Sequence, residues 1–135
     1  MKKVLFTLVV VMGFASISFT AGNNADPKPW PVPDAAKNKK NPVPADAQTI
    51  ATGKTLWTTH CKSCHGAKGV GDGTKAATLK TEPGDFSKAS VQTQTDGSLF
   101  YKLSEGREDM PSFKKKVSDE DDRWALVNFM RTLKK

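Results

Sequence analysis

The chain has 135 residues and a basic composition, with 21 Lys and Arg against 14 Asp and Glu and a formal net charge of +7. Such a chain attracts nucleic acid, acidic proteins or anionic membrane surfaces. Its two cysteines lie in one short motif, which excludes a fold held together by several disulfides.

Residues 1–21 are predicted to be a bacterial secretory signal peptide. Lys2 and Lys3 give a positive start, residues 4–19 are mostly apolar, and small residues follow. We therefore expect an exported, periplasmic protein that meets no nucleic acid, so its charge serves acidic partners or an anionic membrane surface. The apolar run is also about long enough to remain as an uncleaved membrane tether.

Residues 22–47 form a Pro-rich segment with six prolines, Pro27, Pro29, Pro31, Pro33, Pro42 and Pro44. This spacing predicts extended, polyproline-like backbone and no regular helix. Trp30 lies among these prolines, and we expect it to pack onto the following domain. The basic patch at residues 37–40 is predicted to be solvated.

Residues 48–135 are predicted to form one domain that opens with a helix from residue 46 or 47 to residue 62. Small or apolar residues recur along one face of it every three or four positions, at Ile50, Gly53, Trp57 and Cys61.

The end of this helix carries both cysteines in the order Cys61-Lys62-Ser63-Cys64-His65. The spacing Cys-x-x-Cys-His is typical of covalent attachment of a c-type haem. On a helix, two cysteines three positions apart point the same way, so both thiols can reach the vinyl groups on one porphyrin edge. His65 is then placed to bind the iron.

Three other interpretations of these five residues are less favoured. A thioredoxin-like redox pair belongs beside a βαβ pattern, which this chain lacks. A structural zinc site takes four ligands, and here the two Cys and two His crowd between His60 and His65. A disulfide that closes so short a loop adds little stability. Export supports the haem, because its thioether bonds form outside the bacterial cytoplasm.

Irregular backbone is expected after His65. Four glycines within residues 66–73 permit tight turns and exclude a helix, and the Lys-Ser/Thr ending of a phosphate-binding loop is missing. Residues 76–87 are predicted to be irregular, with a turn at Pro83-Gly84 and a buried Phe86.

Two further helices are predicted. Residues 96–105 place three apolar side chains inward, Leu99, Phe100 and Leu103, and Gly106 ends this helix. In the last helix, Ser118 and Asp121 resemble a capping box, and a wide apolar stripe follows, formed by Trp124, Leu126, Val127, Phe129, Met130 and Leu133. No alternating strand pattern occurs, so the predicted fold class is all-α.

Met110 is the preferred candidate for the second axial ligand. It lies in the polar loop 106–113, which has no other reason to hold a thioether, and Pro111 stiffens the backbone beside it. Met130 lies among core residues, where methionine is usually a flexible filler. His60 or an open position are the alternatives. A thioether ligand raises the reduction potential and occupies the position that oxygen or peroxide would need.

Together these features resemble class I c-type cytochromes, in particular bacterial monohaem cytochromes c and oxidase-linked cytochrome c domains. In that family the first helix carries a glycine, an aromatic residue and the first haem cysteine at four-residue steps, as do Gly53, Trp57 and Cys61. Leu126 and Phe129 are similar to the family's pair on the last helix, and Met110-Pro111 to its distal Met-Pro. The resemblance covers about residues 48–133.

The resemblance implies a small cytochrome c fold, with three to four helices around one covalent haem. The first and last helices are expected to cross at Gly53, with Trp57 and Phe129 in contact. One departure concerns His65, whose second ring nitrogen normally donates to a proline carbonyl shortly after the motif. No proline follows until Pro83, so that residue or another carbonyl is expected to accept.

The implied function is that of a periplasmic one-electron carrier and not an enzyme, with no catalytic residue. It would carry a single haem c attached through Cys61 and Cys64, with iron ligated by His65 and Met110, and would serve redox partners with acidic docking surfaces. The alternative is a haem enzyme or gas sensor, peroxidase-like, in which Met110 is displaceable.

Overall fold

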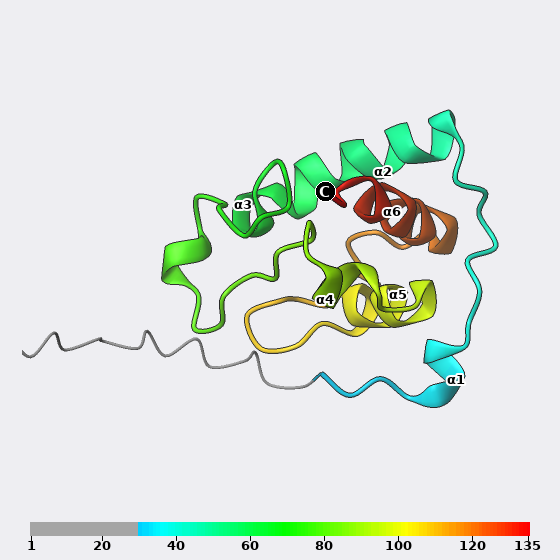
Figure 1. The fold of residues 1–135 in the computed structure, drawn as a ribbon, viewed down its shortest axis with the longest axis horizontal. Helices are drawn as coiled ribbons and strands as arrows, with labels where there is room; N and C mark the ends of the chain where they lie inside the picture. The colour runs from blue at the N-terminus through cyan, green and yellow to red at the C-terminus, as the bar shows by residue number, and fades with distance from the viewer. Residues whose placement is uncertain (1–29) are drawn as a thin grey trace, which may run out of the picture.

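The computed structural model describes residues 30–135 (Figure 1). Its elements are α1 (Asp34–Lys37), α2 (Ala47–His60), α3 (Lys62–His65), the 3₁₀ turn η1 (Ala76–Thr78), α4 (Ala89–Gln92), α5 (Asp96–Glu105) and α6 (Glu120–Thr132). No strand forms in this range, where one isolated bridge pairs Arg107 with Met110. The all-α prediction is confirmed. No helix within residues 30–135 has the length and apolar character to span a membrane, and the expected signal peptide lies outside the described residues.

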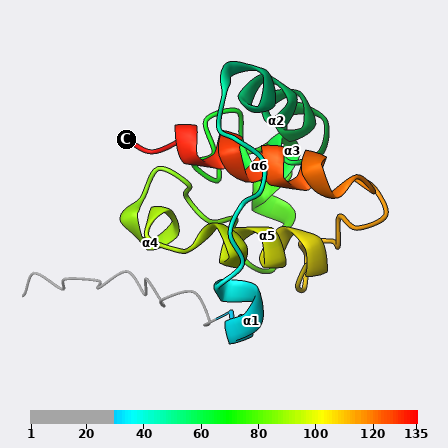
Figure 2. The ribbon, with the colours of Figure 1, turned by 90° about the vertical axis from the view of Figure 1, so that its right-hand side faces the viewer.

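Helices α2 and α6 lie side by side in both views, with α2 along the upper edge and α6 between α2 and α5 (Figures 1 and 2). Gly53 permits this, because a Cβ there would overlap the carbonyl oxygen of Ala125 and lie 2.8 Å from the Cβ of Phe129. The rings of Trp57 and Phe129 are 5.7 Å apart, centroid to centroid. The expected crossing is confirmed.

Helix α5 packs against α6 and supplies the other side of the core. Leu99, Phe100 and Leu103 are buried as expected, and the rings of Phe100 and Trp124 stack at 3.8 Å. Gly106 ends α5 with a φ of 72°, in the left-handed region that favours glycine. Helix α4 was not expected.

The start of α6 differs from the prediction. Its N-cap is Asp119, whose carboxylate accepts a hydrogen bond from the amide of Asp121 at 2.8 Å. The carbonyl of Ser118 instead accepts from the Arg123 guanidinium at 3.0 Å. The predicted capping box at Ser118 was therefore wrong, because the carboxylate of the next residue takes the amide that the box required.

Residues 30–46 form a segment that we call the strap. It runs from the side of α5 that faces away from α6, across α6, to the start of α2 (Figure 2). The strap is extended except for α1, one helical turn that the proline spacing did not predict. Pro33 stands at its N-cap, where a missing N–H is no loss, and the next proline is Pro42. Residues 37–40 are exposed, as predicted, and the ammonium group of Lys39 pairs with Glu120 at 2.6 Å.

Candidate functional site

The two cysteines and the histidine share one tight turn. Helix α2 ends at His60, two residues earlier than expected, and Cys61, with a φ of −112°, separates it from α3. The amides of Cys64 and His65 then both donate to the carbonyl of Cys61, at 3.1 and 2.9 Å. Both cysteines are free thiols, with Cys61 buried and Cys64 half-buried.

Two aromatic rings hold the imidazole of His65. Its centroid lies 5.6 Å from that of Trp57 and 5.2 Å from that of Phe86, with Phe86 edge-on. Trp57 is itself fixed, because its indole N–H donates to the carbonyl of Gly66 at 3.0 Å. The amide of Phe86 donates to the carbonyl of Gly69 at 2.7 Å. The Gly-rich loop therefore closes around His65 and sets the orientation of its ring.

The environment of His65 suits a metal ligand. Burial lowers the pKa of the imidazole, and the backbone of Gly84 opposes this only in part, so the neutral form is favoured. Its Nδ1 is buried without a hydrogen bond inside the protein. Pro83 or another carbonyl was expected to accept from His65; the carbonyl of Pro83 packs on Gly71, and the backbone group that acts on the imidazole is that of Gly84. A neutral imidazole with incomplete hydrogen bonding beside two free thiols fits a covalently attached haem.

The structure disfavours a redox-active cysteine pair and a zinc site at this motif. Burial, and secondarily the neighbouring Cys64, raise the pKa of the Cys61 thiol to about 12. A thiol that resists ionisation is a poor redox nucleophile. Within residues 30–135 no group of three or more His, Cys, Asp or Glu side chains could hold a metal ion, which disfavours zinc.

Met110 lies half-buried against the hydrophobic core, in a loop that several hydrogen bonds hold in place. Backbone hydrogen bonds join Arg107 and Met110 in both directions, at 2.8 and 2.9 Å. The carboxylate of Asp109 accepts from the amides of Lys80 at 2.7 Å and Thr81 at 3.3 Å. These ties to residues 80–81 were not predicted, and the one sequence signal for them was the pair of acidic residues that precedes Met110.

The competing ligands lie in other surroundings. Met130 is a core residue with 3% of its surface exposed, in line with its expected role as a filler. The ring of His60 lies 6.1 Å from that of Phe113, whereas His65 lies against Trp57 and Phe86.

The chain is similar to known proteins in sequence and in structure. Residues 48–130 match the family described as "Cytochrome C oxidase, cbb3-type, subunit III". Among solved structures, the chain is similar to one from the "Kuenenia stuttgartiensis reducing HAO-like protein complex Kustc0457/Kustc0458", with 27% identity and a TM-score of 0.61. That match covers 70% of this chain and 47% of the other, so this chain spans about half the length of that protein.

The chain is also similar to the "KustC0563 c-type cytochrome", with 29% identity and a TM-score of 0.51, over 62% of this chain and 98% of that one. No curated protein matches it. The chain therefore belongs to the class I c-type cytochromes, within the family of cbb3-type cytochrome c domains, which carry covalently bound haem c and transfer electrons.

Proposed function

We propose that the protein is a periplasmic one-electron carrier with a single haem c attached through Cys61 and Cys64 and ligated by His65 and Met110. The observation that carries this proposal is the turn that places two free thiols beside the half-buried imidazole of His65, whose Nδ1 is buried without a hydrogen bond inside the protein. Haem c, when bound here, supplies an iron that accepts and releases one electron at a time.

Each residue has a distinct role in this proposal. Cys61 and Cys64 would form the two thioethers, and Trp57 and Phe86 would hold the ring of His65 so that its donor nitrogen keeps one direction. The thioether of Met110 would raise the reduction potential and exclude oxygen and peroxide from the iron. A fixed pair of ligands suits electron transfer, because little has to rearrange between the two redox states.

Exposed lysines lie along the segments that flank the candidate site, namely Lys62, Lys68, Lys75 and Lys80. We infer that redox partners dock through acidic surfaces in short-lived, charge-steered encounters. Electron-transfer rates with a partner should then fall as ionic strength rises. Rates that stay unchanged between low and high salt would contradict acidic docking.

Optical spectra of the purified protein in both redox states test the ligation. We expect a chromophore that survives extraction with acidified organic solvent, and a weak far-red band in the ferric form that Met110→Ala abolishes. Met130→Leu is the matched control and should keep the band. Carbon monoxide binding by the reduced wild-type protein at neutral pH would instead favour the haem enzyme or gas sensor.

A second candidate function is that of an electron-relay subunit held in a larger redox complex. It is favoured by the similarity to a chain from a reducing HAO-like protein complex. N-terminal sequencing of protein purified from the native membrane and periplasmic fractions separates the two. A free carrier should be periplasmic and lack residues 1–21, whereas a tethered subunit should keep them and co-purify with other redox proteins.

A further inference from the structure

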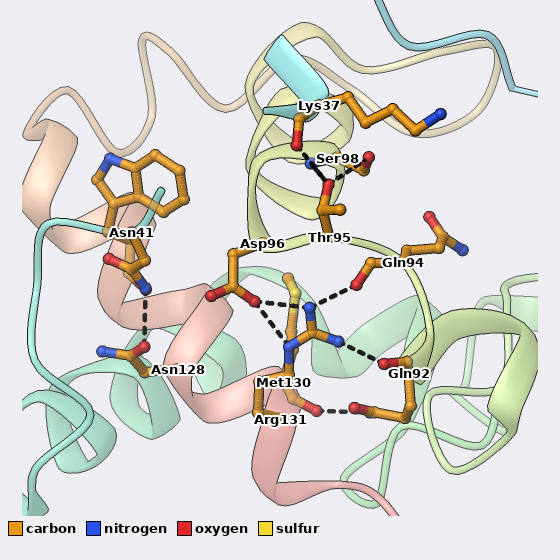
Figure 3. Close-up of polar contacts among 11 residues, drawn as sticks. Lys37, Asn41, Gln92, Gln94, Thr95, Asp96, Ser98, Asn128, Met130 and Arg131 are labelled. Atoms are coloured by element: carbon orange, nitrogen blue, oxygen red, sulfur yellow. Dashed lines mark hydrogen bonds and ion pairs between the residues drawn. The ribbon is translucent and has the colours of Figure 1, made fainter. Parts of the chain in front are cut away.

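The strap lies outside residues 48–130, the part that matches the family, yet it is fastened to the core at several points (Figure 3). The hydroxyl of Thr95 donates to the carbonyl of Lys37 at 2.7 Å, and the side-chain amide of Asn41 donates to Asn128 Oδ1 at 2.8 Å. At Gly97 a Cβ would lie 2.7 Å from the carbonyl oxygen of Lys39, so the strap sits directly on α5. The strap is thus an integral layer of this protein.

The beginning of the strap reaches the loop that carries Met110. The half-buried indole of Trp30 lies 4.6 Å from the guanidinium carbon of Arg107 and 5.6 Å from the ammonium nitrogen of Lys102, measured to the ring centroid. One aromatic side chain therefore contacts two cations, one at the end of α5 and one in the loop after it.

These two cations repel one another. Burial lowers the pKa of Lys102, and Arg107 lowers it further. Lys102 also donates to the side-chain oxygen of Gln94 at 2.6 Å, which limits its freedom to move away. The π face of an aromatic ring attracts a cation within about 6 Å of its centroid. Trp30 thus offsets the repulsion and favours the observed position of Arg107.

The position of Arg107 bears directly on Met110. The two residues exchange backbone hydrogen bonds of 2.8 and 2.9 Å across a tight turn. Inside that turn Glu108 has a φ of 52°, a left-handed conformation that non-glycine residues rarely adopt. Such a conformation persists only where its surroundings hold it. A contact that anchors Arg107 therefore helps to keep the turn closed.

We propose that Trp30 is a positioning residue for Met110, because it holds Arg107 and so keeps the Arg107–Met110 turn closed. The strap is then an addition to the family core that secures the distal ligand. This inference rests on the proposed function in one respect, the assignment of Met110 as a ligand.

The test uses the purified holoprotein that retains Trp30, with three substitutions at that position. Trp30→Ala removes the ring, Trp30→Leu keeps apolar volume without a π face, and Trp30→Phe keeps a smaller ring.

Two quantities are measured: amide hydrogen exchange of the 106–113 segment, and the affinity of the ferric protein for added imidazole. For Trp30→Ala we expect about threefold to tenfold faster exchange and a similar gain in imidazole affinity, the range set by a partly exposed cation–π contact. Trp30→Phe should restore most of the wild-type behaviour and Trp30→Leu should not.

Two control variants separate the possible failures. Lys39→Gln breaks the ion pair of the strap with Glu120 at the start of α6 and should leave exchange in 106–113 unchanged. Met110→Ala should raise imidazole affinity above every Trp30 variant. If Met110→Ala has no effect on that affinity, the ligand assignment fails, while the exchange data still decide whether Trp30 holds the turn. Wild-type exchange in Trp30→Ala, or equal acceleration in Lys39→Gln, would overturn the role of Trp30.

Discussion

Gly53 of α2 and Ala125 of α6 touch backbone to backbone where the two helices cross, since a Cβ on Gly53 would overlap the Ala125 carbonyl oxygen. This close approach sets Trp57 beside Phe129 and His65. The turn with Cys61, Cys64 and His65 follows directly from the end of α2. The packing of α2 on α6 therefore also positions the candidate haem site.

Gly53→Ala should therefore destabilise the protein. An alanine inside a helix gains about 1 kcal/mol of propensity over glycine. Its methyl group would have to displace the backbone of α6, and overpacking of this kind costs about 1–3 kcal/mol or more. We expect a net loss in the free energy of unfolding, measured by denaturant titration of the oxidised holoprotein. Ala51→Ser adds one atom at an exposed position of the same helix and should change little. Stability equal to or above wild type in Gly53→Ala would show that the helices can separate freely.

Asn128→Ala should loosen the strap. The Asn128 side chain is 6% exposed, donates to the carbonyls of Val43 and Pro44 at 3.2 and 3.1 Å, and accepts from Asn41. Removing it takes the Asn128 donor from the carbonyl of Val43, whereas the carbonyl of Pro44 still accepts from the hydroxyl of Thr49 at 2.6 Å. We expect a loss of about 1–3 kcal/mol in the free energy of unfolding. In a double-mutant cycle with Asn41→Ala, we expect a coupling energy of about 0.5 kcal/mol or more. Additive effects of the two substitutions would mean that the side chains do not cooperate in holding the strap.

The Glu120–Lys39 pair should make stability depend on pH. The hydrogen bond from Lys39, at 2.6 Å, is the main cause that lowers the pKa of Glu120 below its ordinary value of 4.5. A carboxyl group with a lowered folded pKa stabilises the fold above the unfolded pKa, and this contribution disappears as pH falls through the folded pKa. Glu120→Gln should thus be less stable than wild type at neutral pH and equal to it in acid.

This difference should be small, at most about 1 kcal/mol, because both side chains are about half exposed. Thermal unfolding of both proteins across the acid range measures it, and added salt should shrink it. Glu82→Gln, at another exposed position, is the control. If the difference in stability between Glu120→Gln and wild type grew as the pH fell, the predicted pH dependence would be wrong.

Short-range patterns in the sequence predicted most of the helical framework. The spacing of Gly53, Trp57 and Cys61 marked the buried face of α2, and Gly106 marked the end of α5. Cys61, Cys64 and His65 could be grouped in advance because they are adjacent in the chain. Local patterns suffice where both the cause and its effect lie within a few residues.

Contacts between distant segments could not be predicted in this way. The acidic residues before Met110 indicate a polar contact, but not that the carboxylate of Asp109 binds amides 28 and 29 residues away. Trp30 was expected to pack on the domain, but its cationic partners follow from the path of the strap. The prediction for the start of α6 was wrong because Ser118 and Asp119 are both good N-caps, and in the fold the carboxylate of Asp119 accepts from the amide of Asp121.

Asp109 ties the turn of Met110 to residues 80–81. Its Oδ2 accepts from two amides, at 2.7 and 3.3 Å, while Glu108 accepts from the hydroxyl of Thr81 at 2.7 Å. Asp109→Ala removes the amide contacts, and exposure to water limits the loss to about 1 kcal/mol. Because a factor of ten corresponds to about 1.4 kcal/mol, we expect the ferric protein to bind added imidazole about fivefold more tightly.

Asp109→Asn keeps a side-chain acceptor and should show a smaller change, and Asp121→Ala, at the start of α6, should leave imidazole binding unchanged. If Asp109→Ala binds imidazole as wild type does while Met110→Ala binds it more tightly, the tie to residues 80–81 has no part in holding the ligand.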